Sequence, residues 1–249
     1  MSSASQLYDE IGAPYTVTRR TEPRIAARIW DALGDARTLL NVGGGHRLLR
    51  APRPQCHRGG TVGGHAGPAP AGAAPRVAGT AESLPFDDQS FDAAMAVSTV
   101  HHWQDPIAGL REMRRVARQV VVFTFDGIDP GWIRRFWLTR DYLPETAELL
   151  VDRPTLGELA AAITARNELV LIPWDCADGF FEAYWRRPEA YLDDHIRRGV
   201  SVWARVGAEA EQRAVCNLRD DLVSGRWTQR NRDLIALDEI DLGLRLLVT

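Results

Sequence analysis

The 249-residue chain lacks the features that mark several classes of protein. Its three cysteines, Cys56, Cys176 and Cys216, form no CxxC pair, which argues against a zinc site and favours a reducing compartment. No apolar run approaches the ~20 residues that a membrane-spanning helix requires, and the first residues do not resemble a signal peptide. The net charge is −3 and the arginines are dispersed, without a basic block for nucleic acid. We therefore expect a cytoplasmic protein with no metal, membrane or nucleic-acid partner.

Acidic residues are missing from one long stretch of the chain. Residues 36–81 contain no aspartate or glutamate, although the whole chain has 33 acidic residues. Within this stretch, residues 46–76 are so rich in glycine, alanine, proline and arginine that composition alone indicates a loop without regular structure. One hypothesis is a shifted reading frame over about residues 44–76. With suitable synonymous codons, the neighbouring frame encodes a third glycine, a short strand and a glutamate near Gly60. The alternative is a genuine flexible insertion.

The better-patterned parts of the chain indicate an α/β fold. Residues 91–97 are nearly all apolar or small, as in a strand that is covered on both faces of a parallel sheet. Asp105 and Pro106 then mark the start of a helix, and a second apolar run follows at 120–125. A strand, a helix and a strand in this order predict a right-handed crossover. We expect a Rossmann-like, doubly wound, mostly parallel sheet.

Other periodic segments complete this expectation. A helix is predicted from Thr21 to Gly34, and the apolar strand 37–42 leads directly into Gly43-Gly44-Gly45. Later elements are expected at 155–166 (helix), 168–174 (strand), 180–232 (helices) and 242–248 (strand). Six of the eight tryptophans lie between Trp132 and Trp227, where they form either a packed helical cover or an aromatic substrate pocket. We expect a single domain over 1–249, with a helical insertion within 127–232.

Three motifs resemble those of the class I S-adenosylmethionine-dependent methyltransferases, most closely the type 11, small-molecule family. They are Asn41-Val42-Gly43-x-Gly45 at the end of the first strand, AESLPFDDQSFD over 81–92, and VSTVHHW over 97–103. The second motif is the most specific, because it stands directly before a buried strand. The resemblance covers roughly residues 5–126, apart from the unusual segment 46–76. It implies a seven-stranded sheet and S-adenosylmethionine as the cofactor.

The resemblance also implies a set of cofactor-binding residues at the carboxyl edge of the sheet. Glycines at the first strand–helix turn would let backbone amides approach the methionine part of the cofactor. The turn at residues 80–82 would hold the adenine, and Arg19 would pair with the cofactor's carboxylate. The implied residues are Tyr15, Arg19, Asn41, Gly43, Gly45, Thr80, Ala81, Glu82, Val97 and Ser98.

Two histidines are candidates for catalysis. His101 and His102 stand where a general base would take a proton from an attacking hydroxyl, amine or carbon acid. We prefer His102, which lies further along the loop. The alternative is that one histidine packs beneath the cofactor while the other caps the next helix. The implied activity is in-line methyl transfer to a small molecule by a monomer or homodimer.

Two departures from the family pattern bear on cofactor binding. Arg47 stands at the third glycine position, and no acidic residue between Asp35 and Glu82 is available for the ribose hydroxyls. We therefore expect the chain as written to bind S-adenosylmethionine weakly. A cofactor-defective relative that acts as a binding or structural partner stays open. An RNA methyltransferase is disfavoured because there is no basic stripe, and a nicotinamide dehydrogenase because the AESLPF block has no role there.

Overall fold

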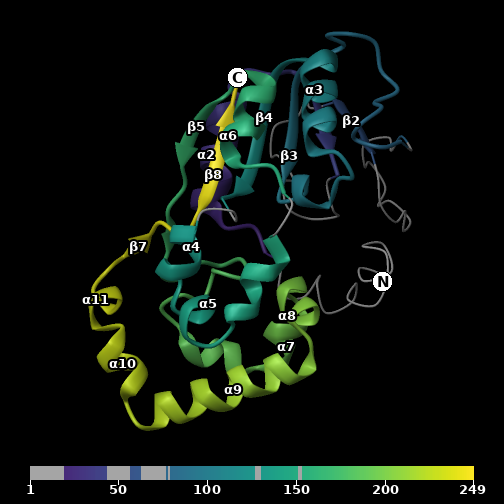
Figure 1. Cartoon of the computed structure of the whole chain (residues 1–249). Helices are drawn as coiled ribbons and strands as arrows, with labels where there is room; N and C mark the ends of the chain where they lie inside the picture. The colour runs from purple at the N-terminus through teal and green to yellow at the C-terminus, as the bar shows by residue number, and fades with distance from the viewer. Residues whose placement is uncertain (1–19, 44–56, 63–76, 78, 127–129, 151–152) are drawn as a thin grey trace. The chain divides into compact units, whose positions relative to one another are not determined.

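The computed structural model describes residues 20–43, 57–62, 77, 79–126, 130–150 and 153–249 (Figure 1). The chain divides into two compact units. The first, here called the sheet unit, comprises Arg24–Asp126, Pro154–Val170 and Leu244–Thr249. The second, called the helical unit, comprises Met1–Pro23, Gly127–Arg153 and Leu171–Gly243. A single domain with an insertion within 127–232 stays a prediction.

The sheet unit is built on a mostly parallel sheet, so the predicted Rossmann-like architecture is confirmed (Figure 1). Its described strands are β1 (Thr38–Val42), β2 (His57–Val62), β3 (Phe91–Val97), β4 (Ala117–Phe125), β5 (Arg166–Leu169) and β8 (Leu244–Val248). They lie in the order β2-β1-β3-β4-β8-β5, and β8 runs antiparallel to both of its neighbours. Six strands are therefore described where seven were predicted.

Strand β2 corrects the interpretation of residues 46–76 as a loop throughout. Residues 57–62 pair in parallel with β1, with Thr38 opposite His57 and Val42 opposite Val62. A glycine-rich segment can pair in this way because the ladder is made by backbone N–H and C=O groups. Side-chain composition therefore underestimates the strand. The shifted reading frame stays a hypothesis.

Helices α2 (Pro23–Leu33) and α3 (Pro106–Val116) begin where the sequence predicts, whereas the helix predicted at 155–166 ends at Ile163, because Arg166 already belongs to strand β5. Helix α2 stops at Gly34, whose φ of +54° is a conformation that glycine adopts readily. Helix α3 is capped by Asp105, whose side chain accepts a hydrogen bond from the Ala108 amide at 2.9 Å. Helix α6 (Leu156–Ile163) starts with a capping box between Thr155 and Glu158.

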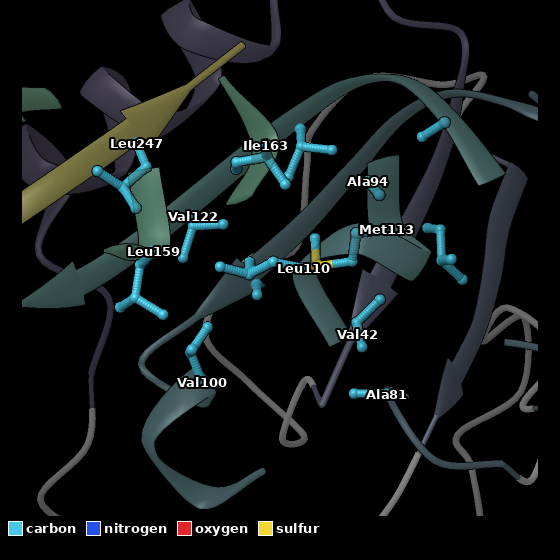
Figure 2. Packing of buried hydrophobic residues seen from close by; sticks show 14 of the residues in the cluster. Val42, Ala81, Ala94, Val100, Leu110, Met113, Val122, Leu159, Ile163 and Leu247 are labelled. Carbon is cyan, nitrogen blue, oxygen red and sulfur yellow. The ribbon is translucent and has the colours of Figure 1, made fainter. Parts of the chain in front are cut away.

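The core of the sheet unit lies between the sheet and helices α3 and α6. Figure 2 shows this cluster, to which β1, β3, β4 and β8 also contribute. Its labelled members are Val42, Ala81, Ala94, Val100, Leu110, Met113, Val122, Leu159, Ile163 and Leu247. Val100 lies after the carboxyl end of β3, and Ala81 lies in the turn at residues 80–83, so the same packing that stabilises the sheet also anchors these two segments.

The predicted strand 168–174 is wrong as a single element. It divides into β5, which joins the main sheet, and β6 (Ile172–Pro173), which pairs with β7 (Glu239–Ile240) in the helical unit. Both segments are extended and partly apolar, so the local pattern does not show that the chain changes partners between them. The predicted last strand is confirmed as β8.

The helical unit has an aromatic core. Its remaining elements are α4 (Pro130–Arg135), α5 (Trp137–Asp141), η2 (Pro144–Leu150), η3 (Pro188–Leu192), α7 (Asp194–Arg198), α8 (Ser201–Val206), α9 (Ala208–Val223), α10 (Arg226–Arg230) and α11 (Arg232–Ile235). Trp137, Trp185, Trp203 and Trp227 are buried. Trp137 donates to the Trp185 carbonyl at 2.7 Å and packs edge-to-face on Trp227. These four tryptophans form a packed core.

Two helical glycines of the sheet unit differ in the space around them, which yields a stability test. A Cβ on Gly109 of α3 would lie 2.6 Å from Cε3 of Trp103, whereas a Cβ on Gly157 of α6 would meet nothing closer than 3.9 Å. We expect Gly109→Ala to lower the free energy of unfolding by about 1–3 kcal/mol through overpacking. Gly157→Ala should raise it by up to about 1 kcal/mol, because alanine is the better helix former. Urea denaturation measures both, and shifts of the same sign would contradict the packing.

Candidate functional site

The carboxyl ends of β1 and β3 meet at one edge of the sheet. Strand β1 ends in Asn41, Val42 and Gly43, while β3 ends at Val97 and continues through Ser98 and Thr99 into the short helix η1 (Val100–His102). The two strands are neighbours in parallel register, with Asn41 opposite Met95. In open α/β sheets this edge is where ligands bind.

Gly43 is required by both its conformation and its surroundings. Its φ is +76°, and a Cβ at this position would lie 2.2 Å from Oγ1 of Thr99. Thr99 is itself only 7% exposed. The turn after β1 is therefore in direct contact with the loop after β3, at a distance that only glycine permits.

Ser98 turns the chain away from β3. Its φ of +49° is a left-handed conformation that costs a residue with a side chain roughly 1–2 kcal/mol. The Ser98 amide still donates to the Phe123 carbonyl of β4 at 2.8 Å, so the ladder continues up to the turn. Strained backbone of this kind clusters at functional sites.

Asn41 carries an unused hydrogen-bond acceptor at this edge. Its Oδ1 is buried without a hydrogen-bond partner. A buried amide oxygen left in this state costs free energy that a donor on a ligand would recover. Asn41 and the Gly43 turn therefore fit the end of a ligand that carries hydrogen-bond donors.

The turn at residues 80–83 is a tight one held by its own backbone. The Ser83 amide donates to the Thr80 carbonyl at 3.2 Å, and Ala81 is buried in the core cluster. Oε1 of Glu82 accepts hydrogen bonds from the amides of Gln104 at 2.9 Å and Asp105 at 3.1 Å. Partial burial raises the pKa of Glu82, but these amides and the Thr80 hydroxyl lower it by more, so the pKa lies below its ordinary value.

The AESLPFDDQSFD block is fastened to α3 by a pair of charges that the sequence reasoning missed. Glu112 accepts from the Leu84 amide at 3.0 Å and pairs with Arg115 at 2.7 Å. Arg115 also donates to the Phe86 carbonyl and pairs with Asp88 at 2.7 Å. The spacing of Glu112 and Arg115 by three residues on a predicted helix was the available signal. Among the described residues, no cluster of acidic, histidine or cysteine side chains could hold a metal ion.

At the other end of the block, Asp92 joins the starts of β1 and β3. Its Oδ2 accepts from the Arg37 amide, the Thr38 amide and the Thr38 hydroxyl at 2.9–3.0 Å. Hydrogen bonds from Thr38 are the main reason that the pKa of Asp92 lies below its ordinary value. Asp92 therefore sets the register of the two strands whose far ends form the candidate site.

The two histidines of η1 are in contact with each other. Their ring centroids lie 3.8 Å apart, and the His101 ring also packs against the edge of Phe125, with centroids 5.4 Å apart. His101 is half-buried and His102 is exposed. Of the two, His102 is the more accessible to solvent.

The described residues thus bring most of the expected site together. Asn41, Gly43, Val97 and Ser98 share one sheet edge, while Thr80, Ala81 and Glu82 form a turn tied to the loop that follows η1. Tyr15, Arg19 and Gly45 lie outside the described residues, as does Arg47. Thr99, Glu112 and Arg115 are additions from the structure.

Comparison with known proteins finds similarity to methyltransferases. The family described as a methyltransferase domain matches residues 65–125. The protein YafE of Escherichia coli is 36% identical over 100 residues, which cover 38% of this chain and 44% of YafE. The methyltransferase YcgJ of Bacillus subtilis is 42% identical over 67 residues, which cover 27% of this chain and 21% of YcgJ. The chain thus matches less than half the length of either curated relative.

A solved structure extends the likeness to nearly the whole chain. A candidate methyltransferase from an antibiotic biosynthesis pathway of Anabaena variabilis superposes with a TM-score of 0.76 at 26% identity, covering 93% of this chain and 98% of that one. Together with the family match over residues 65–125, this supports a methyltransferase domain of the Rossmann-like class I fold. Within the described ranges, no helix has both the length and the apolar character needed to cross a membrane.

The contact between Gly43 and Thr99 can be tested by a double-mutant cycle. Gly43→Ala should lower the free energy of unfolding by about 2–4 kcal/mol, from backbone strain and overpacking together. Thr99→Ala removes Oγ1 and Cγ2 and leaves only the Cβ, at 3.1 Å. In the double variant we expect a favourable coupling of about 1 kcal/mol. Additive effects in urea denaturation would show that the two loops are not in contact.

Proposed function

We propose that this chain transfers a methyl group from S-adenosylmethionine to a small molecule. The observation that carries the proposal is the sheet edge where the Gly43 turn, the buried Asn41 carbonyl and the loop after β3 converge. The methyltransferase family match supports the activity. The likeness to a protein of an antibiotic biosynthesis pathway supports an acceptor of low molecular weight.

The residues of this edge have distinct tasks in the proposed reaction. When bound, S-adenosylmethionine supplies a methyl group on a positively charged sulfur. Asn41 and the amides of the Gly43 turn would hold its amino-acid end, and the turn at 80–82 would hold its adenine. Val97 and Ser98 would line the space between these ends. Methyl transfer needs mainly alignment of donor and acceptor, which a rigid sheet edge provides.

His102 is the proposed general base for the acceptor. It is exposed, it is the last residue of the short helix η1 that follows β3, and its ring contacts that of His101, which packs on Phe125. This stack restricts the rotation of the His102 ring, so a nitrogen lone pair is held in a limited range of directions. We propose that the enzyme works as a cytoplasmic monomer or homodimer.

One observation favours a second candidate function, a binding protein that has lost the cofactor. Strand β2 runs beside β1 to Val62, yet no aspartate or glutamate occurs from residue 36 to residue 81. A carboxylate on the strand beside the glycine turn is the usual partner of ribose hydroxyls. Without it, the nucleoside loses hydrogen bonds to a charged group.

Calorimetric titration with S-adenosylhomocysteine distinguishes the two functions. The comparison is between the chain as printed and a chain whose residues 44–76 are translated from the neighbouring frame. We expect the second chain to bind about 10- to 100-fold more tightly, the effect of hydrogen bonds to a regained carboxylate. Equal affinities would contradict the role of the missing acid. Absence of binding by both chains would reject methyl transfer.

A second experiment addresses the histidine. His102→Asn keeps a polar side chain of similar size and removes the proton acceptor. We expect turnover of S-adenosylmethionine with a panel of hydroxyl, amine and phenol acceptors to fall by about 10²- to 10⁴-fold. The affinity for S-adenosylhomocysteine should stay within about twofold, because the ring is not assigned to cofactor binding. Unchanged turnover would show that His102 is not the general base and that catalysis comes from the alignment of methyl donor and acceptor alone.

A further inference from the structure

We infer that Glu82 is a positioning residue, which links the turn for the adenine to the loop that carries the two histidines. This inference rests on the proposed function, because it assigns a purpose to the contact between two parts of that site. It differs from the role that the family resemblance implies, in which Glu82 itself contacts the cofactor.

The first support is that the Glu82 carboxylate accepts its hydrogen bonds from the protein's own backbone. Its Oε1 accepts from the amides of both Gln104 and Asp105. These are bonds to an ionised acceptor, which are roughly twice as strong as neutral ones. The carboxylate is thereby committed to the protein's own backbone.

The second support is where those two amides lie. Gln104 and Asp105 stand between η1 and α3, two and three residues after His102. On one side, two backbone hydrogen bonds hold η1. The His102 amide donates to the Thr99 carbonyl at 2.8 Å, and the Trp103 amide donates to the Val100 carbonyl at 3.2 Å. On the other side, Asp105 caps α3. A displacement of Glu82 is therefore transmitted to the histidine turn through two or three backbone units.

A third support is an apolar contact beside the hydrogen bonds. A Cβ on Gly109 would lie 2.6 Å from the Trp103 ring and 3.2 Å from the Ala81 Cβ. Trp103 and Ala81 therefore approach the same point on α3 from the histidine loop and from the adenine turn. The turn and the loop are thus held together by polar bonds on Glu82 and by packing on α3, so they move as one body.

Glu112 offers a matched control. Like Glu82, it is half-buried and accepts a hydrogen bond from a backbone amide. The donor is the amide of Leu84, in the AESLPFDDQSFD block, at 3.0 Å. Its other partner is Arg115 on its own helix, which leads to Phe86 and Asp88 and away from η1. Loss of Glu112 should therefore loosen the AESLPFDDQSFD block without reaching the histidines.

The decisive experiment needs no ligand. Hydrogen exchange is measured on the full chain for wild type, Glu82→Gln, Glu82→Ala and Glu112→Gln. We expect the amides of Gln104 and Asp105 to exchange at least about fivefold faster in Glu82→Gln and faster still in Glu82→Ala. The amides of His102 and Trp103 should follow them. In Glu112→Gln the four amides should stay within about twofold of wild type. Unchanged exchange of His102 and Trp103 in Glu82→Ala would overturn the inference.

A second measurement separates positioning from direct contact. Adenosine, which lacks the amino-acid end of the cofactor, is titrated while the His102 ring is followed by NMR, with assignment from His102→Asn. We expect adenosine to shift the ring signal in wild type and Glu112→Gln but not in Glu82→Ala. Weaker adenosine binding without faster exchange at Gln104 and Asp105 would show direct contact and overturn the inference. If neither adenosine nor S-adenosylhomocysteine binds wild type, the proposed function fails and the exchange rates alone decide the role of Glu82.

Discussion

The structure depends on the burial of the central residues of β3. Ala93, Ala94 and Ala96 have no exposed surface and Met95 has almost none, so this strand is covered on both faces. Short side chains let the covering helices approach closely, and the strand forms the centre from which β1 and β4 take their register. Asp92, at the start of β3, accepts a hydrogen bond from the Thr38 amide at the start of β1. This bond fixes the register of the two strands, so the end of β3 lies at a fixed position beside Gly43. The candidate site is thus a consequence of how the core is packed.

Close contacts between the loops at the carboxyl edge of the sheet fix the shape of the candidate ligand site. The left-handed conformations of Gly43 and Ser98 turn the backbone away from the sheet at the ends of β1 and β3. Thr99 fills the space against Gly43. The left-handed conformation of Ser98 costs conformational free energy, which the surrounding core offsets. The unpartnered Oδ1 of Asn41 adds a further cost at the same edge. Costs concentrated at one edge of an otherwise well-packed sheet are expected where binding, rather than folding, has determined the residues.

The sequence allowed the elements of β1, β3, β4, α2 and α3 to be predicted because each carries its own periodicity and its own stop or cap, such as Gly34 and Asp105. Features that depend on distant partners could not be predicted. The division of residues 168–174 between two sheets is decided by Arg245 and Ile240, more than sixty residues later. The contact of Thr99 with Gly43 and the bonds of Glu82 to Gln104 also join segments whose spacing along the chain shows no pattern. The sequence predicted that Asn41, Gly43, Val97 and Ser98 share one edge of the sheet, whereas it did not predict the links between the loops there.

The acid-free stretch shows why a fold and its activity have to be judged separately. Pairing of β2 with β1 uses backbone groups, so the glycine-rich residues 57–62 complete the sheet order without any particular side chain. Recognition of a ribose, in contrast, requires a carboxylate at one position, and composition over residues 36–81 provides none. A change of sequence over this stretch can therefore leave the order of the strands unchanged while it removes the carboxylate that would accept hydrogen bonds from the ribose. Structural likeness to a methyltransferase is retained under such a change, and affinity for the cofactor is the quantity that responds to it.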